Sequence, residues 1–202
     1  MIKRFLFILS LSIPVMSVAL PQPESDMSDP QELLNTPAVP SRASAAVGRH
    51  IQTIEKWFKK NNFTTRTERQ GEVLVVVIPA SDLFEANEDE LRPESLKRLS
   101  LFERAINNPE SYRILVWAHT DDAGDEVYSD SLSSRRAENV QSAFEQIASK
   151  NGVKSNIYYT GFGSERPLKP NDSLANRNTN RRIEIYIVPQ QRTIDNARSG
   201  KL

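Results

Sequence analysis

Residues 73–78 constrain the fold of this 202-residue chain more than any other segment. They form an uninterrupted run, Val-Leu-Val-Val-Val-Ile, and Pro79 follows directly. A strand that is central in a sheet, or covered on both faces, has such a run because no position has to face water. A second apolar run, at residues 114–117, has the same character. The sequence therefore predicts a sheet with interior strands.

Amphipathic helices are predicted around these strands. Between residues 41 and 60, apolar side chains recur at spacings of three and four, which is the period of one helix face. The same spacing recurs from Pro93 to about residue 106 and from about residue 130 to Lys150. The apolar residues that define the three stripes are Val47, Ile51, Ile54 and Phe58; Leu96, Leu99, Phe102 and Ile106; and Ala137, Val140, Phe144 and Ile147.

The order of the elements predicts the fold class. Further strands are expected at residues 63–67, 156–160 and 183–188, where β-branched and aromatic side chains gather. Strand–helix–strand units imply some parallel pairing with right-handed crossovers. We therefore expect an α+β fold, a two-layer sandwich in which helices cover one face of a mixed four-stranded sheet. This domain is expected to span residues 73–189, and residues 41–72 add an extra helix and strand that pack on it.

The N-terminus predicts the compartment. Lys3 and Arg4 precede an apolar stretch of 14 residues, and small residues follow at positions 17–19, as a signal peptidase requires. Residues 1–19 are therefore predicted to be a signal peptide. An uncleaved membrane anchor is the alternative, but a span needs about 20 apolar residues. The chain is expected to be exported to a Gram-negative periplasm, in association with the cell wall or the outer membrane.

Two segments lack any apolar period. Residues 20–40 contain five prolines and are predicted to be a proline-rich linker. Residues 190–202 are polar and are predicted to be a disordered tail.

Composition argues against several functions. The 26 basic and 26 acidic residues give a net charge of zero, which argues against a nucleic-acid partner. The chain has no cysteine and only two histidines, so we expect no disulfide, no metal site and no cofactor. Neither a nucleophile elbow nor a phosphate-binding loop is present, so we expect a protein that is not an enzyme.

A charged turn and a charged helix position carry the chemistry. Asp121 follows the strand predicted at residues 114–117, on a turn where Gly124 permits positive φ. Arg136 lies in the first turns of the next predicted helix. A ligand carboxylate would meet the guanidinium and the helix N-terminus, and a ligand ammonium would meet Asp121. From the spacing alone, a structural salt bridge between Asp121 and Arg136 is the alternative.

With their surroundings, these residues resemble the OmpA-like peptidoglycan-binding domain family. The resemblance covers residues 80–189 and rests on a combination of motifs, since each motif alone is weak. The matching residues are Leu83, Phe84, Asn87, Leu91, Pro93, His119, Thr120, Asp121, Gly124, Tyr128, Leu132, Ser133, Arg136, Ala137, Val140, Gly161, Phe162, Gly163, Pro167, Asn171, Arg177, Asn180, Arg181, Arg182, Ile183 and Glu184.

The resemblance implies a ligand and a site. In the family, an aspartate and an arginine that match Asp121 and Arg136 clamp the meso-diaminopimelate of the peptidoglycan stem peptide. The further binding residues that it implies are Asn87 and Leu132, with Thr120 and Arg182 at the rim.

Some positions depart from the family pattern. The clamp is intact, but fewer hydrogen-bonding groups surround it, so weaker binding or a shifted preference among stem peptides is expected. The departures are Glu85, Ala86, Ala118, Ala123 and Ser129.

A basic cluster precedes the last strand. We expect Arg177, Arg181 and Arg182 to tie the last loop to the sheet edge and to cap carbonyls, with Glu184 as their ion-pair partner. Direct contact with the ligand is the alternative for this cluster.

The predicted function is non-catalytic binding of peptidoglycan through diaminopimelate, which would anchor an envelope protein to the cell wall. The alternative is a periplasmic protein–protein interaction or regulatory module on the same fold. A second partner, an outer-membrane or other envelope protein, is expected through residues 20–60. The resemblance allows a dimer, but no residue requires one.

Overall fold

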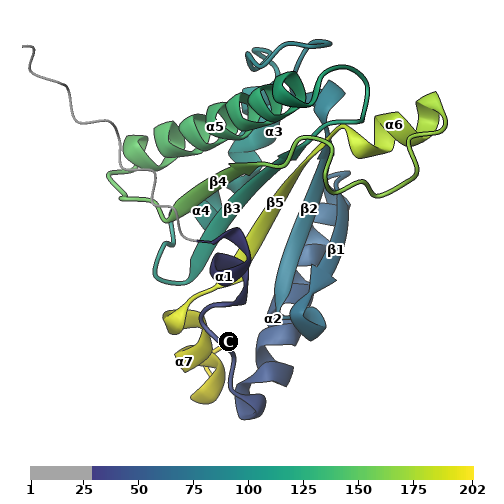
Figure 1. Ribbon diagram of the computed structural model, residues 1–202. Helices are drawn as coiled ribbons and strands as arrows, with labels where there is room; N and C mark the ends of the chain where they lie inside the picture. Colours follow the sequence, from purple (N-terminus) through teal and green to yellow (C-terminus); the bar gives the residue numbers. More distant parts are fainter. Residues whose placement is uncertain (1–28) are drawn as a thin grey trace, which may run out of the picture.

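The computed structural model describes residues 29–202, which contain one five-stranded sheet in the order β1-β2-β5-β3-β4 (Figure 1). The predicted signal peptide lies outside the described residues. Strands β3 and β4 pair in parallel, and all other neighbours are antiparallel. The predicted mixed α+β sheet is therefore confirmed, with β1 as the extra strand at one edge. The strands are β1 (Thr64–Glu68), β2 (Val73–Pro79), β3 (Tyr112–His119), β4 (Ile157–Gly161) and β5 (Arg182–Pro189).

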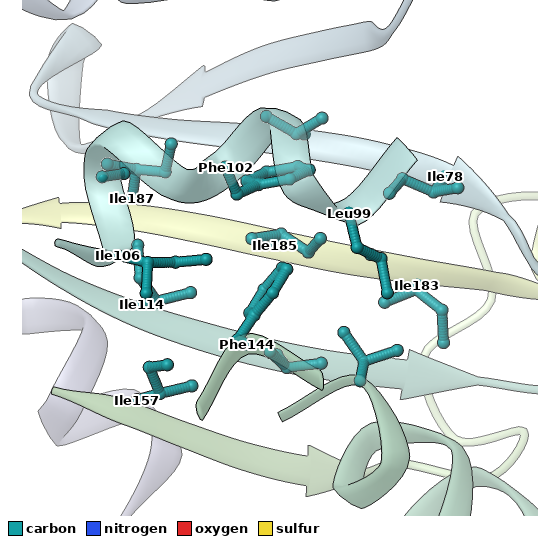
Figure 2. Packing of buried hydrophobic residues seen from close by; sticks show 14 of the residues in the cluster. Ile78, Leu99, Phe102, Ile106, Ile114, Phe144, Ile157, Ile183, Ile185 and Ile187 are labelled. Atoms are coloured by element: carbon teal, nitrogen blue, oxygen red, sulfur yellow. The ribbon is translucent and has the colours of Figure 1, made fainter. Parts of the chain in front are cut away.

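Helices cover one face of the sheet and enclose the larger core. The alternate residues Ile183, Ile185 and Ile187 of β5 point into this layer and are fully buried. Phe102 and Phe144 pack over Ile185, with ring centroids 5.3 Å apart (Figure 2). The long helices of this layer are α2 (Ser41–Lys60) and α5 (Glu126–Lys150).

The segment between β2 and β3 is less regular than its apolar stripe predicts. It divides into α3 (Ser95–Leu99), the 3-10 turn η3 (Ser100–Phe102) and α4 (Glu103–Ile106). The apolar spacing places Leu96 on the buried face of this segment, but this residue is 50 % exposed in the structure. The break between these pieces turns Leu96 outward while Leu99 stays in the core.

Helix α1 (Pro30–Asn35) lies on the opposite face of the sheet (Figure 1). The prediction of a linker is therefore wrong for residues 30–35, and so is the prediction that helices cover only one face. Asp29 caps the helix, and Leu33 and Leu34 are buried. The apolar side chains of this face are Val73, Val75, Leu115, Trp117, Phe162, Tyr186 and Val188.

Two arginines hold α1 in place. Arg69 donates to the carbonyl oxygens of Leu34 at 3.0 Å and Pro37 at 2.9 Å. Arg113 donates to the carbonyl oxygens of Leu33 at 2.9 Å and Thr36 at 3.1 Å. These bonds satisfy carbonyls that a short helix leaves without partners at its C-terminus. The local signal for the helix is the capping residue Asp29 followed by Pro30, but both arginines are distant in sequence, so no local pattern shows where the helix docks.

The predicted disordered tail contains helix α7 (Gln191–Arg198), so this prediction is also wrong. Thr193, Ile194 and Ala197 are buried, and the helix packs against α2. The hydroxyl of Thr193 also donates to the carbonyl oxygen of Ser111 at 2.8 Å. The C-terminal residues therefore complete the helical layer.

Replacing Ile194 by alanine is expected to lower the free energy of unfolding by about 2 kcal/mol or more, because Ile194 is 1 % exposed. Urea denaturation measures the change. The matched control is Gln191→Ala, since Gln191 lies on the exposed side of the same helix. Equal stability of the two variants would contradict the docked helix.

Candidate functional site

A pocket of about 370 Å³ lies where β3 ends and α5 begins. It is formed by the 3-10 turn η2 (Ala80–Asp82), the loop that follows it, the turn after β3, and the end of helix α6 (Leu174–Asn180). Several of the predicted site residues line it. The lining residues are Ala80, Ser81, Phe84, Glu85, Ala86, Asn87, Arg92, Thr120, Asp121, Ala123, Tyr128, Ser129, Leu132, Arg136, Asn178 and Arg181.

Asp121 supplies the negative charge of the pocket. It follows β3 directly and is 5 % exposed. Its Oδ2 accepts a hydrogen bond from Nη1 of Arg181 at 2.9 Å. Within residues 29–202, Asp121 forms no ion pair with Arg136, so the structural salt bridge between those two residues is absent.

Arg136 supplies a buried positive charge. Its Nε donates to the carbonyl oxygen of Glu88 at 2.8 Å, and Nη2 donates to that of Glu85 at 3.3 Å. The guanidinium also lies over the ring of Phe84, 5.0 Å from its centroid. Burial lowers the pKa of Arg136, yet an arginine stays protonated at neutral pH. Its Nη1 has no hydrogen-bond partner in the described part of the chain and is free for a ligand.

Helix α5 begins earlier than the sequence indicated. Its N-cap is Asp125, whose side chain accepts from the backbone N–H groups of Val127 and Tyr128. Arg136 therefore lies well inside the helix rather than in its first turns. Because the Asp125 carboxylate already accepts from two of the N-terminal N–H groups, it takes the place of the ligand anion that the sequence suggested at the helix terminus.

The remaining predicted residues form the walls. Asn87 has a positive φ of 61°, and its carbonyl oxygen accepts from the hydroxyl of Tyr128 at 3.2 Å. Leu132 is a buried apolar wall residue. Thr120 is 6 % exposed, and its Oγ1 has no hydrogen-bond partner within residues 29–202. A buried hydroxyl without a partner favours a ligand that supplies one.

Arg182 does not lie at the rim, so this prediction is wrong. It is 3 % exposed and points to the other face of the sheet, where its Nε donates to Oε1 of Glu184 at 2.7 Å. It also donates to the carbonyl oxygens of Asn180 and Arg166, both at 3.0 Å. The expected roles in capping carbonyls and in pairing with Glu184 are confirmed for Arg182. Its neighbour Arg181 lines the pocket instead.

Glu184 is the centre of a buried polar network beneath the pocket turn. Burial alone would raise its pKa, but hydrogen bonds from Arg66 and Tyr186 and the charge of Arg182 outweigh burial and lower the pKa to about 2. Burial and the charge of Arg182 lower the pKa of His119 to about 3. His119 is therefore neutral at neutral pH, and its 3.8 Å approach to Glu184 is not an ion pair.

The network makes stability depend on pH. In the unfolded chain His119 takes up a proton near pH 6.5, but in the folded protein only near pH 3, so the unfolded state binds more protons in between. The free energy of unfolding is expected to fall as the pH is lowered from about 6.5 towards 3. Glu184 adds to the loss below its ordinary pKa of 4.5.

Urea denaturation at pH 7 and pH 5.5 measures the contribution of His119. His119→Phe is expected to lose less stability over this range than the wild type. Some dependence remains, because burial also lowers the pKa of His50. An unchanged dependence in His119→Phe would contradict the assignment.

The model of the OmpA family matches residues 83–181. Residues 83–181 form an OmpA family domain. All the pocket residues except Ala80 and Ser81 lie within this match, including Asp121, Arg136 and Arg181.

Curated relatives share this domain. Outer-membrane lipoprotein YfiB of Pseudomonas aeruginosa is 37 % identical over 109 residues, which are 54 % of this chain and 62 % of that protein. Outer membrane protein A of Bordetella avium is 32 % identical over 113 residues, 56 % of this chain and 57 % of that protein. The chain thus spans about three-fifths of the length of these relatives. Their names confirm the predicted envelope context of the domain.

Solved structures confirm the fold. A putative MotB-like protein from Desulfovibrio vulgaris has a TM-score of 0.63 and 22 % identity, covering 73 % of this chain and 94 % of that one. The cell wall anchor of the T6SS from Pseudomonas aeruginosa has a TM-score of 0.54 and 22 % identity, covering 69 % and 96 %. Within residues 29–202, no helix is both long and apolar enough to span a membrane.

Arg181 is the pocket residue of the OmpA family domain that the sequence reasoning underestimated. The sequence pattern places Arg181 in a basic cluster with a structural role, but in the structure its guanidinium donates directly to Asp121. The sequence feature that indicates this role is the position of Arg181, one residue before β5. From there its side chain lies in the pocket together with Asp121. Ala86, Ala123 and Ser129, the departures from the family pattern, also line this pocket.

Proposed function

We propose that this protein binds peptidoglycan without catalysis, through the diaminopimelate of the stem peptide. The observation that carries the proposal is the pair of opposite charges in one pocket: the carboxylate of Asp121 and the free Nη1 of Arg136. Diaminopimelate ends in an ammonium and a carboxylate on one carbon. A pocket with one site for each charge matches that end group.

In the proposed complex, the ligand ammonium meets Asp121 and the ligand carboxylate meets Arg136. Oδ1 of Asp121 accepts no hydrogen bond from the described residues, so it is open to an ammonium. Arg181 already neutralises Oδ2, and it lies where it can turn towards the ligand carboxylate. The hydroxyl of Thr120 supplies one further buried polar contact.

The size of the pocket favours a side chain over a sugar chain. About 370 Å³ is near the lower limit of small-molecule pockets, which are roughly 300–1,000 Å³. Charge-assisted hydrogen bonds contribute about 1.5–3 kcal/mol each. Two or three of them, less the cost of ordering the ligand, give an affinity between about micromolar and millimolar.

The lack of a hydrogen-bond partner for the Thr120 hydroxyl within residues 29–202 favours binding over catalysis. Oγ1 of Thr120 has no hydrogen-bond partner within residues 29–202, so no base is in place to activate it. Among the described residues, the neighbouring His119 also has no hydrogen-bond partner on either ring nitrogen. Two relatives from P. aeruginosa are named as lipoproteins: YfiB, and a peptidoglycan-associated lipoprotein that is 26 % identical over 102 residues. Their names support an anchoring role in the envelope. A second envelope partner through residues 20–60 stays a prediction.

Co-sedimentation with purified sacculi tests the proposal. Asp121→Asn removes the negative charge of the pocket. Arg136→Lys keeps the positive charge but removes the planar guanidinium. Both substitutions keep most of the side-chain volume. The matched controls are the exposed neighbours Asp122→Asn and Arg135→Lys. We expect the first pair to release the protein into the supernatant and the controls to sediment like the wild type. Undiminished sedimentation of both pocket variants, with the fold intact by circular dichroism, would refute the proposal.

A further inference from the structure

The outer surface of α2 is strongly basic, although the chain as a whole is neutral. The helix contains five basic residues and one acidic residue. All five basic side chains belong to exposed residues. The basic residues are Arg42, Arg49, Lys56, Lys59 and Lys60.

Four of these cations form a line along the helix. Arg42, Arg49 and Lys56 are seven residues apart, and Lys60 follows one turn later. At 3.6 residues per turn, they project from one side of the helix over about 27 Å. The buried residues of the opposite side, including Val47, project into the core. The line is therefore the outermost part of this face of the molecule.

Within residues 29–202, no carboxylate forms a salt bridge with these four cations. Glu55 is the acid of α2, and it pairs with Lys59 at 2.9 Å while accepting from Thr65 at 3.0 Å. Within residues 29–202, Arg42, Arg49, Lys56 and Lys60 form no salt bridge. Unpaired cations in a row attract a surface of opposite charge.

An exposed tryptophan flanks the line. Trp57 is 44 % exposed, and its ring lies edge-on to that of Phe58, with ring centroids 5.0 Å apart. Tryptophan beside lysine and arginine is the composition of a membrane–water interface, where the ring sits at the level of the headgroups. Residues of α2 line neither the pocket at the end of β3 nor the hollow between Pro109 and α7. A row of exposed cations along a helix suits a flat, fluid surface better than a small ligand.

We propose that the outer line of α2 binds the anionic headgroups of a phospholipid bilayer. Each lysine or arginine near such a surface adds a small attraction that salt screens, so four give weak, salt-dependent attachment. The binding is peripheral, because the apolar side of α2 is occupied by the core.

The distribution of charge would orient the domain on that surface. Residues 82–94 contain six acids and one base, and residues 121–130 contain five acids and no base. Both segments border the pocket, so an anionic bilayer repels the pocket end while it attracts α2. This inference stands on α2 alone and does not depend on the ligand of the pocket.

Vesicle co-sedimentation tests the inference. The probes are vesicles of phosphatidylcholine alone and of phosphatidylcholine with phosphatidylglycerol. The wild type is expected to sediment only with the anionic vesicles and to be released by added salt. The triple variant Arg49→Gln, Lys56→Gln, Lys60→Gln is expected to bind roughly tenfold or more weakly.

A second triple variant with the same change of charge is the control. Lys150→Gln, Lys154→Gln, Lys169→Gln removes three exposed lysines outside α2 and is expected to bind like the wild type. Tryptophan fluorescence adds a local readout, since Trp117 is buried and Trp57 would report lipid contact by a blue shift.

Three results would overturn the inference. The first is a wild type that does not bind anionic vesicles. The second is an equal loss of binding in the two triple variants, which would mean that net charge rather than α2 decides. The third is an α2 variant that keeps vesicle binding but loses sacculus binding, which would assign the surface to the wall polymer.

Discussion

Asp121→Asn is expected to weaken the binding of a diaminopimelate-containing peptide by about 10- to 100-fold. The substitution removes one charge-assisted hydrogen bond to the ligand ammonium, worth about 1.5–3 kcal/mol, and each 1.4 kcal/mol is a factor of ten. Asp121 is 5 % exposed, so water replaces the lost contact poorly. Isothermal titration calorimetry with the free peptide measures the change.

The same substitution separates ligand binding from a structural effect. Asp121 also pairs with Arg181 at 2.9 Å, so its removal frees a cation in the pocket. A peptide whose end group keeps the carboxylate but lacks the ammonium should therefore bind Asp121→Asn at least as well as it binds the wild type. If both peptides lose affinity equally, Asp121 acts on the shape of the pocket and not on the ammonium.

Glu184→Ala is expected to lower the free energy of unfolding by about 3–5 kcal/mol, because it leaves the buried guanidinium of Arg182 without its acidic partner. The carboxylate is 2 % exposed and accepts from Arg182 at 2.7 Å, from Arg66 at 3.0 Å and from Tyr186 at 2.6 Å. Arg182 is itself buried and has no other acidic partner within residues 29–202. Urea denaturation at pH 7 measures the loss.

The matched control for Glu184 is Glu68→Ala. Glu68 pairs with the same Arg66 at 2.9 Å, but near the surface, where an ion pair contributes only about 0–1 kcal/mol. A loss of less than 1 kcal/mol in Glu184→Ala would mean that water or another anion reaches Arg182, contrary to its burial.

The sequence predicts the sheet well because each strand has its own local pattern. The continuous apolar run at residues 73–78 lies in β2, an interior strand. Ile183, Ile185 and Ile187 alternate and bury the same face of β5. The sequence does not predict helices α1 and α7, because both depend on contacts with distant parts of the chain. Helix α1 has six residues, and it is held by the burial of Leu33 and Leu34 on the sheet and by two arginines far along the chain.

The candidate site was largely predictable, apart from the basic cluster. Asp121 is predictable because it lies on a turn directly after a strand, and Arg136 because it lies on the helix that follows. The structure places both residues in one pocket. Arg181 and Arg182 could not be told apart, because neighbouring residues at the start of a strand point to opposite faces. A shift of one residue in the boundary of β5 would exchange their roles. Whether these residues bind diaminopimelate stays a prediction.

The most direct test of the central claim is a calorimetric titration with two stem peptides that differ only at the third residue. One peptide carries meso-diaminopimelate and the other carries lysine, which lacks the second carboxylate. The clamp predicts that the diaminopimelate peptide binds about tenfold or more tightly, and that Arg136→Lys removes most of this difference. Equal affinities of the two peptides for the wild type would contradict the clamp.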